Sequence, residues 1–74
     1  MNNTHVITKP KTKSVDVFEL NGQTVKRVVM EINGRDVQVL SYDLSPMLTV
    51  LIGDKAEQVH IIDLDEYITE QVQP

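Results

Sequence analysis

The sequence predicts a small α+β fold that is mainly β: an antiparallel sheet of about four or five strands followed by a short C-terminal helix. Three observations support this fold class. One Asn-Gly pair, at 33–34, separates two β-rich runs. A second Asn-Gly pair, at 21–22, follows a run in which apolar and polar residues alternate. Near the C-terminus, over 64–72, apolar residues recur every three or four positions, which is typical of a helix.

The two Asn-Gly pairs define the first three strands, residues 14–20, 24–32 and 35–42. Both central residues of a type I′ turn need positive φ, which Asn tolerates and Gly adopts without strain. Two-residue loops give a register that places Asp16 opposite Arg27, a pair of opposite charges.

This register distributes apolar side chains over both faces of the sheet. One face carries Val15, Val17, Val28, Met30, Ile32, Val37 and Val39, and the other carries Phe18, Leu20, Val25, Val29, Leu40 and Tyr42. An antiparallel sheet in water usually has one polar face. We therefore expect one face to pack on the remainder of the chain and the other on a second copy or a partner.

Residues 1–13 are predicted to form a disordered basic arm, and residues 14–74 a single small domain. The arm is polar, lacks apolar periodicity and contains Pro10 between lysines. It has no aromatic residue on which nucleic-acid bases could stack.

The segment 47–52 is compatible with two structures. Its apolar and β-branched residues favour a buried strand, whereas Ser45, Pro46 and Gly53 would suit the ends of a two-turn helix. The strand is the preferred interpretation, and in either case the segment belongs to the core or to an interface. Residues 58–64 are predicted to form the strand that pairs with it.

The last predicted element is a helix over residues 65–72. Asp63 or Asp65 can cap its first turn, where negative charge is favourable. Four apolar residues share one face of this helix and can pack on the sheet: Leu64, Tyr67, Ile68 and Val72.

With 74 residues, the chain is short for a self-sufficient domain. A single core of this size rarely supplies more than about 3–5 kcal/mol, and small proteins usually add disulfides, a metal or a partner. The chain has no cysteine, and its two histidines, His5 and His60, lie at opposite ends. We therefore expect a protein partner or a homodimer to supply the additional stability.

The composition also indicates where the protein resides. No apolar run approaches the roughly 18 residues of a membrane span. The N-terminus lacks the basic start and apolar run of a secretory signal, and the absence of cysteine fits a reducing compartment. The expected location is the cytoplasm, without a membrane partner.

Charge is distributed unevenly around a net value of −4. Residues 1–35 contain six basic and three acidic residues, whereas residues 36–74 contain one basic and eight acidic residues. Such polarisation can steer a partner of opposite charge.

No catalytic, cofactor-binding or metal site is predicted. The three glycines lie at turns and not in a phosphate-binding loop, and His60 lies in an apolar run without a nucleophile arranged beside it. The acidic group at 63–66 lacks the spacing of a calcium loop. We expect no enzymatic activity, no cofactor and no small-molecule substrate.

The preferred function is protein binding by a small regulatory or inhibitory module. A short, cysteine-free, acidic β protein without chemistry of its own fits, by analogy and not by a motif, an inhibitor or adaptor encoded by a phage or another mobile element. The predicted protein interface is formed by Val25, Val29, Leu40, Tyr42, Leu48, Val50 and Ile52. An acidic surface for a basic partner is predicted from Asp63, Asp65, Glu66 and Glu70.

Two alternatives accompany this prediction. The first is nucleic-acid binding through the basic residues Lys9, Lys11, Lys13, Lys26, Arg27 and Arg35, although the sequence has no helix-turn-helix, zinc or RNA-recognition signature. The second is a structural or assembly subunit that forms higher oligomers.

Overall fold

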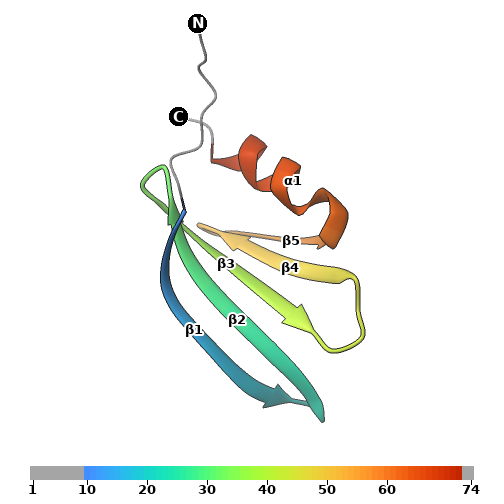
Figure 1. Ribbon diagram of the computed structural model, residues 1–74. Coiled ribbons are helices and arrows are strands. Elements are labelled where there is room, and N and C mark those ends of the chain that lie inside the picture. The colour runs from blue at the N-terminus through green and yellow to red at the C-terminus, as the bar shows by residue number, and fades with distance from the viewer. Residues whose placement is uncertain (1–9, 73–74) are drawn as a thin grey trace, which may run out of the picture.

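The computed structural model describes residues 10–72, which form a five-stranded antiparallel sheet and a short C-terminal helix (Figure 1). The strands are arranged across the sheet in chain order, so each strand pairs with the next one. This architecture confirms the predicted mainly β fold with a helix at the C-terminal end. The elements are β1 (Lys11–Leu20), β2 (Gln23–Ile32), β3 (Arg35–Tyr42), β4 (Met47–Ile52), β5 (Lys55–His60), the 3-10 helix η1 (Ile61–Asp63) and α1 (Leu64–Gln71).

Two-residue turns join β1 to β2 and β2 to β3. Asn21 and Gly22 have φ values of 54° and 77°, and Asn33 and Gly34 have values of 53° and 79°. These are the positive φ angles that a type I′ turn requires at both positions. In the resulting register Asp16 lies opposite Arg27.

The first strand begins at Lys11 and not at Ser14. Lys11 and Lys13, which were predicted to lie in the basic arm, are therefore part of the sheet. A β-bulge between Thr12 and Ser14 shifts the pairing with β2 near the start of the strand. The remainder of the predicted arm, residues 1–9, lies outside the described residues.

Residues 47–52 form β4, so the strand interpretation is correct for this segment. The next strand, β5, ends at His60, whereas the prediction extended it to residue 64. The Ile61 N–H still donates to the Pro46 carbonyl at 2.8 Å, in line with the pairing of Met47 and His60. The chain turns away immediately afterwards, where His60 Nδ1 accepts from the Ile62 N–H at 3.2 Å and caps η1.

The hydrophobic core lies between α1 and one face of the sheet. Its buried members come from four strands and the C-terminal helical region: Ile32, Val37, Val39, Leu48, Val50, Ile52, Val59, Ile68 and Val72. Met30, Leu64 and Tyr67 pack against this core, so the predicted apolar face of the helix does face the sheet. Asp63 occupies the N-cap position of α1, but its side chain makes no capping hydrogen bond, contrary to the predicted role.

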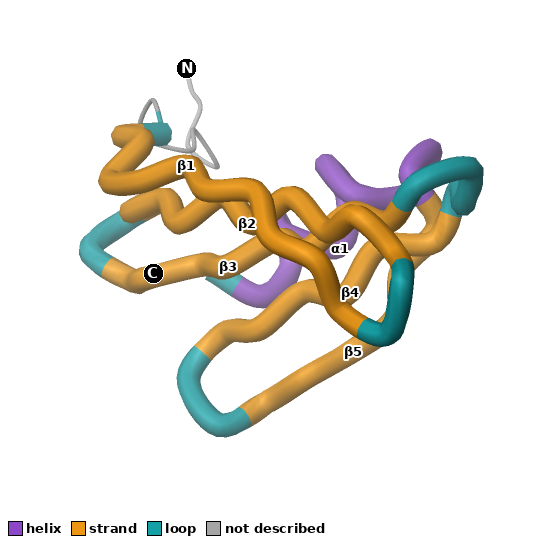
Figure 2. Tube along the Cα trace, turned by 90° about the horizontal axis from the view of Figure 1, so that it is seen from below, coloured by secondary structure: helices purple, strands orange, loops and turns teal. Residues whose placement is uncertain are grey.

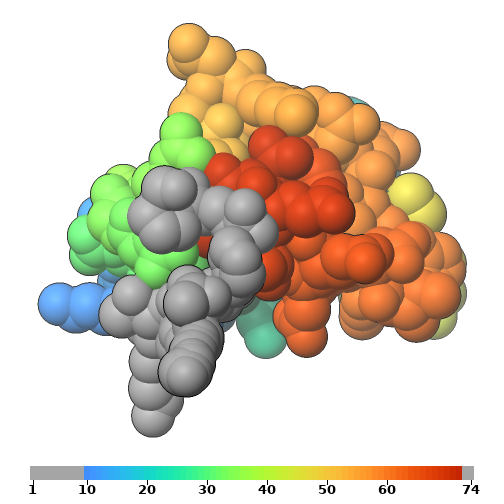
Figure 3. Space-filling model, turned by 90° about the horizontal axis from the view of Figure 1, so that it is seen from above, coloured from blue at the N-terminus to red at the C-terminus, as the bar shows by residue number. Residues whose placement is uncertain are grey.

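Two turns of the sheet hold the C-terminal end of α1. Asn33 Nδ2 donates to the Val72 carbonyl at 2.9 Å, and Arg35 Nη1 donates to the Gln71 carbonyl at 2.7 Å. Lys55 Nζ, after the β4–β5 turn, donates to the Gln71 side chain at 3.3 Å. Figure 3 shows the end of α1 lying between these two turns. The last carbonyls of a helix have no hydrogen-bond donor within the helix. Here the sheet turns supply donors for two of them.

Within residues 10–72, α1 and η1 are too short and insufficiently apolar to cross a membrane.

Candidate protein-interaction surfaces

The sheet face opposite α1 is called here the open face. Among residues 10–72, the helix lies on the other side of the sheet (Figures 1 and 2). Side chains on the open face alternate along each strand with those that enter the core. The apolar members of the open face are Phe18, Leu20, Val25, Val29, Leu40, Tyr42, Met47 and Leu51.

The structure brings four of the predicted interface residues together on the open face. Val25 pairs with Tyr42 on one side and with Phe18 on the other. Its side chain is only 1% exposed, so Val25 supports its neighbours and offers little surface of its own. Val29, Leu40 and Tyr42 are half-buried and remain accessible.

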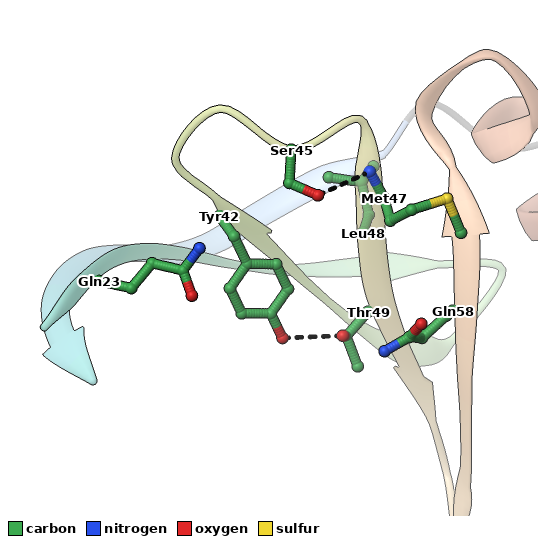
Figure 4. Close-up of a pocket in the computed structure, with 7 residues that line it drawn as sticks. All are labelled: Gln23, Tyr42, Ser45, Met47, Leu48, Thr49 and Gln58. Carbon is green, nitrogen blue, oxygen red and sulfur yellow. Dashed lines mark hydrogen bonds between the residues drawn. The ribbon is translucent and has the colours of Figure 1, made fainter. Parts of the chain in front are cut away.

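Tyr42 borders a hollow of about 370 Å³ on the open face (Figure 4). Its hydroxyl lies 2.8 Å from Thr49 Oγ1 on β4, and this hydrogen bond fixes the orientation of the ring. At the edge of the hollow, Ser45 Oγ accepts from the Met47 N–H at 3.2 Å. The residues lining the hollow are Gln23, Tyr42, Ser45, Met47, Leu48, Thr49 and Gln58. Its lining thus combines apolar side chains with amide and hydroxyl groups.

The three predicted interface residues from β4 lie elsewhere. Leu48, Val50 and Ile52 are buried in the core beneath α1. They pair with Ser41, Val39 and Val37, whose side chains face the same side of the sheet. The sequence did not reveal this arrangement because almost every residue of β4 is apolar, so neither face of the strand was marked by polarity.

An ion pair lies beside the aromatic side chain of Phe18 on the open face. Arg27 donates from Nε to Asp16 Oδ1 at 3.1 Å and from Nη2 to Asp16 Oδ2 at 2.8 Å. The guanidinium carbon lies 5.4 Å from the centre of the Phe18 ring, within the range of a cation–π contact. The hydrogen bond to Asp16 and its negative charge raise the pKa of Arg27 above its ordinary value, so this arginine stays charged at any ordinary pH.

A second surface lies between β5 and α1 and is called here the acidic groove. It has a volume of about 420 Å³, and its carboxylates come from Glu57, Asp63, Glu66 and Glu70. His60 and Tyr67 also line it, and no lysine or arginine within residues 10–72 does. Glu57 was not predicted for this surface, because only the pairing of β5 in the sheet brings it alongside the helix.

Asp65 does not join the acidic groove. It borders a separate hollow with Met30 and Ile32. The separation follows from helical geometry, since residues 63, 66 and 70 are three or four positions apart and share one side of α1. Among the described residues, no group of histidines and carboxylates is arranged to hold a metal ion.

The residues predicted for nucleic-acid contact do not converge on one surface. Lys13 Nζ reaches Asp36 at 3.1 Å, and Arg35 binds the end of α1. Lys26 and Arg27 are adjacent in β2 and therefore point to opposite faces of the sheet. Lys11 is exposed near the start of β1, and Lys9 lies outside the described residues.

Comparisons of the chain with protein-family models, curated proteins and solved structures find no match.

Proposed function

We propose that this protein is a non-enzymatic binding module whose open face docks on another protein. The observation that carries the proposal is the composition of that face, which no described element covers. A sheet face that meets only water is normally polar. Here Phe18, Leu40 and Tyr42 lie next to the Asp16–Arg27 pair, and aromatic residues and arginine are enriched at protein interfaces.

Tyr42 is the proposed anchor of the interface. It is the last residue of the central strand β3, and the hydrogen bond to Thr49 holds its ring in place before binding. A preorganised aromatic side chain loses little conformational entropy when it is covered. The adjacent hollow supplies room for a side chain of the partner and polar groups to pair with it.

The acidic groove favours a partner that carries basic residues near the docked surface. Its four carboxylates, with no lysine or arginine of the described part of the chain in the lining, create a negative field at one edge of the sheet. Such complementarity mainly raises the association rate and the specificity of a complex. A module without chemistry of its own acts by occupying a functional surface of its partner, which makes it a regulator or an inhibitor.

Affinity capture from a lysate of the source organism, with and without nuclease, tests the proposal. We expect Tyr42→Ala to lose a captured protein that the unaltered chain retains after nuclease treatment. Ile62→Ala is the matched control, because Ile62 lies in η1 and not in a strand of the sheet, and is 81% exposed. Unchanged capture by folded Tyr42→Ala, or capture that disappears with nuclease, would contradict the proposal.

A further inference from the structure

The strand β1 forms one edge of the sheet and pairs only with β2 among the described elements (Figure 1). Its residues are exposed, apart from Asp16 and Phe18, which are half-buried. None of them belongs to the hydrophobic core. An edge strand presents unpaired N–H and C=O groups, which can pair with a strand of another chain.

The pairing with β2 indicates which backbone groups of β1 point away from the sheet. Leu20 pairs with Gln23 across the two-residue turn, and residues flanking such a turn hydrogen-bond to each other. Alternate residues along an antiparallel strand then direct their backbone groups outward. Counted back from Leu20, this outward set is Val15, Val17 and Glu19.

Two of these outward residues also expose apolar side chains. Val15 is 54% exposed and Val17 is 62% exposed, on the face of the sheet that carries α1. The core beneath α1 includes residues of β2 to β5 but none of β1. The β1 part of this face is therefore not covered by any of the described residues. The β-branched side chains stand beside the free edge, where a further strand would pack on them.

We propose that two copies of this chain associate by antiparallel pairing of β1 with β1 of the second copy. The product is one continuous sheet with five strands from each copy. The two-fold axis can pass through residue 15, 16 or 17. In each of these registers a valine of one copy lies opposite a valine of the other. The interface is isologous, because the same strand contributes both sides.

The charges of β1 complement this arrangement. Lys11 and Lys13 lie near the start of the strand, and Glu19 lies near its end. Antiparallel pairing brings the basic start of one strand against the acidic end of the other, and cross-strand pairs of opposite charge are favourable. The β-bulge lies between Thr12 and Ser14, so Ser14–Leu20 remains regular for pairing.

The other edge of the sheet is less suited to pairing with a second copy of itself. β5 has six residues, against ten in β1. Glu57 of β5 lies beside the other carboxylates of the acidic groove. Pairing β5 with β5 would bring two acidic surfaces together, at a cost in repulsion.

The proposed dimer leaves the open face accessible. The two-fold axis of an antiparallel strand pair is perpendicular to the sheet, so both open faces lie on the same side of the joined sheet. Docking on a partner and dimerisation therefore use separate surfaces, and either proposal can fail without the other.

Sedimentation equilibrium over a wide concentration range provides the first test. We expect the unaltered protein to have the mass of two chains. Val17→Pro should have the mass of one chain, and Val17→Thr should keep the mass of two. Proline removes the outward N–H that pairs with the second copy, and an edge position with an outward N–H tolerates it. Threonine keeps both the N–H and the β-branch. A single chain throughout, a dimer that persists in folded Val17→Pro, or open-ended oligomers from β1–β5 pairing would overturn the proposal.

A cysteine variant keeps the test valid if Val17→Pro fails to fold. The chain has no cysteine, so an introduced one can pair only with its counterpart in a second copy. We expect one of Val15→Cys, Asp16→Cys and Val17→Cys, the one that lies at the two-fold axis, to form a covalent dimer on mild oxidation, whereas Ala56→Cys, exposed on β5, stays monomeric. Equal cross-linking of Ala56→Cys, or no cross-linking in any of the three β1 variants, would overturn the proposal.

Discussion

The side-chain amide of Asn33 donates a hydrogen bond to the main-chain carbonyl of Val72 at 2.9 Å. This contact joins the β2–β3 turn to the end of the C-terminal helical region, across most of the described chain. Arg35, two residues after Asn33, donates to the neighbouring Gln71 carbonyl. The turn therefore has two roles: it reverses the chain, and it supplies donors to a helix end.

The first prediction separates these two roles. Asn33→Gly keeps the positive φ of the turn but removes the side-chain donor, so we expect the free energy of unfolding to fall by about 0.5–1.5 kcal/mol. Asn21→Gly is the matched control, because Asn21 occupies the same position in the β1–β2 turn. Urea denaturation measures both variants, and equal losses would contradict a specific role for the Asn33–Val72 contact.

The second prediction concerns Leu44, which has a φ of 59° and is fully exposed. It lies in a turn closed by the Ser45 N–H donating to the Tyr42 carbonyl at 3.3 Å. The left-handed conformation costs a residue with a Cβ about 1–2 kcal/mol. Leu44→Gly should therefore raise the free energy of unfolding by about 0.5–1 kcal/mol, after the greater entropy of glycine in the unfolded chain is subtracted.

Leu44→Ala is the control for that measurement. Alanine removes the exposed side chain but keeps the Cβ, so we expect a change within about 0.5 kcal/mol. Thermal denaturation of the two variants side by side is sufficient. A glycine variant no more stable than the alanine variant would argue against strain at this position.

The third prediction compares two isoleucines near the C-terminus. Ile68 is 6% exposed and belongs to the core, whereas Ile62 is 81% exposed. Ile68→Ala should lower the free energy of unfolding by about 2–4 kcal/mol, because it leaves a cavity between α1 and the sheet. Ile62→Ala should change it by less than about 0.5 kcal/mol. Similar losses in the two variants would mean that α1 does not pack on the sheet through Ile68.

The fourth prediction concerns the Asp16–Arg27 pair, in which both side chains are more than two-fifths exposed. Because the pKa of Arg27 is raised, the stability that the pair gains through the charge of Arg27 is fully present below the ordinary arginine pKa and is lost as pH rises through the raised pKa. The coupling in a double-mutant cycle with Asp16→Asn and Arg27→Gln should be the same at about pH 6 and about pH 9. It should weaken in high salt, as expected for an exposed pair. A coupling that disappears between these pH values would contradict the prediction.

The sequence was most informative where a residue type has few conformations open to it. Asn and Gly at 21–22 and 33–34 adopt positive φ, and the pairing of Asp16 with Arg27 follows from the short loop between β1 and β2. The apolar spacing of Leu64, Tyr67 and Ile68 was likewise sufficient to predict which side of the helix packs on the sheet.

The sequence was least informative where the chain is uniformly apolar or where the result depends on distant contacts. Nothing within β4 distinguishes Leu48 from Leu51, yet only the first enters the core. At the end of β5 the His60 side chain accepts from the Ile62 N–H and caps η1, a role that its place in an apolar run does not indicate. The acidic groove includes Glu57 because the sheet brings β5 next to α1, a relationship that local spacing does not encode.

The chain-order arrangement of the strands has a consequence for the rate of folding. Every neighbouring pair in the sheet is joined by a short connection, so most native contacts are local for a β protein. Hairpins of this kind form in about 1–10 μs, and low contact order is associated with fast folding. The contact that joins distant parts of the chain is the docking of α1 on the β2–β3 turn. This docking needs residues 33–35 to be in place first, because they donate hydrogen bonds to the end of the helix. We therefore expect the sheet to assemble hairpin by hairpin and the helix to dock last.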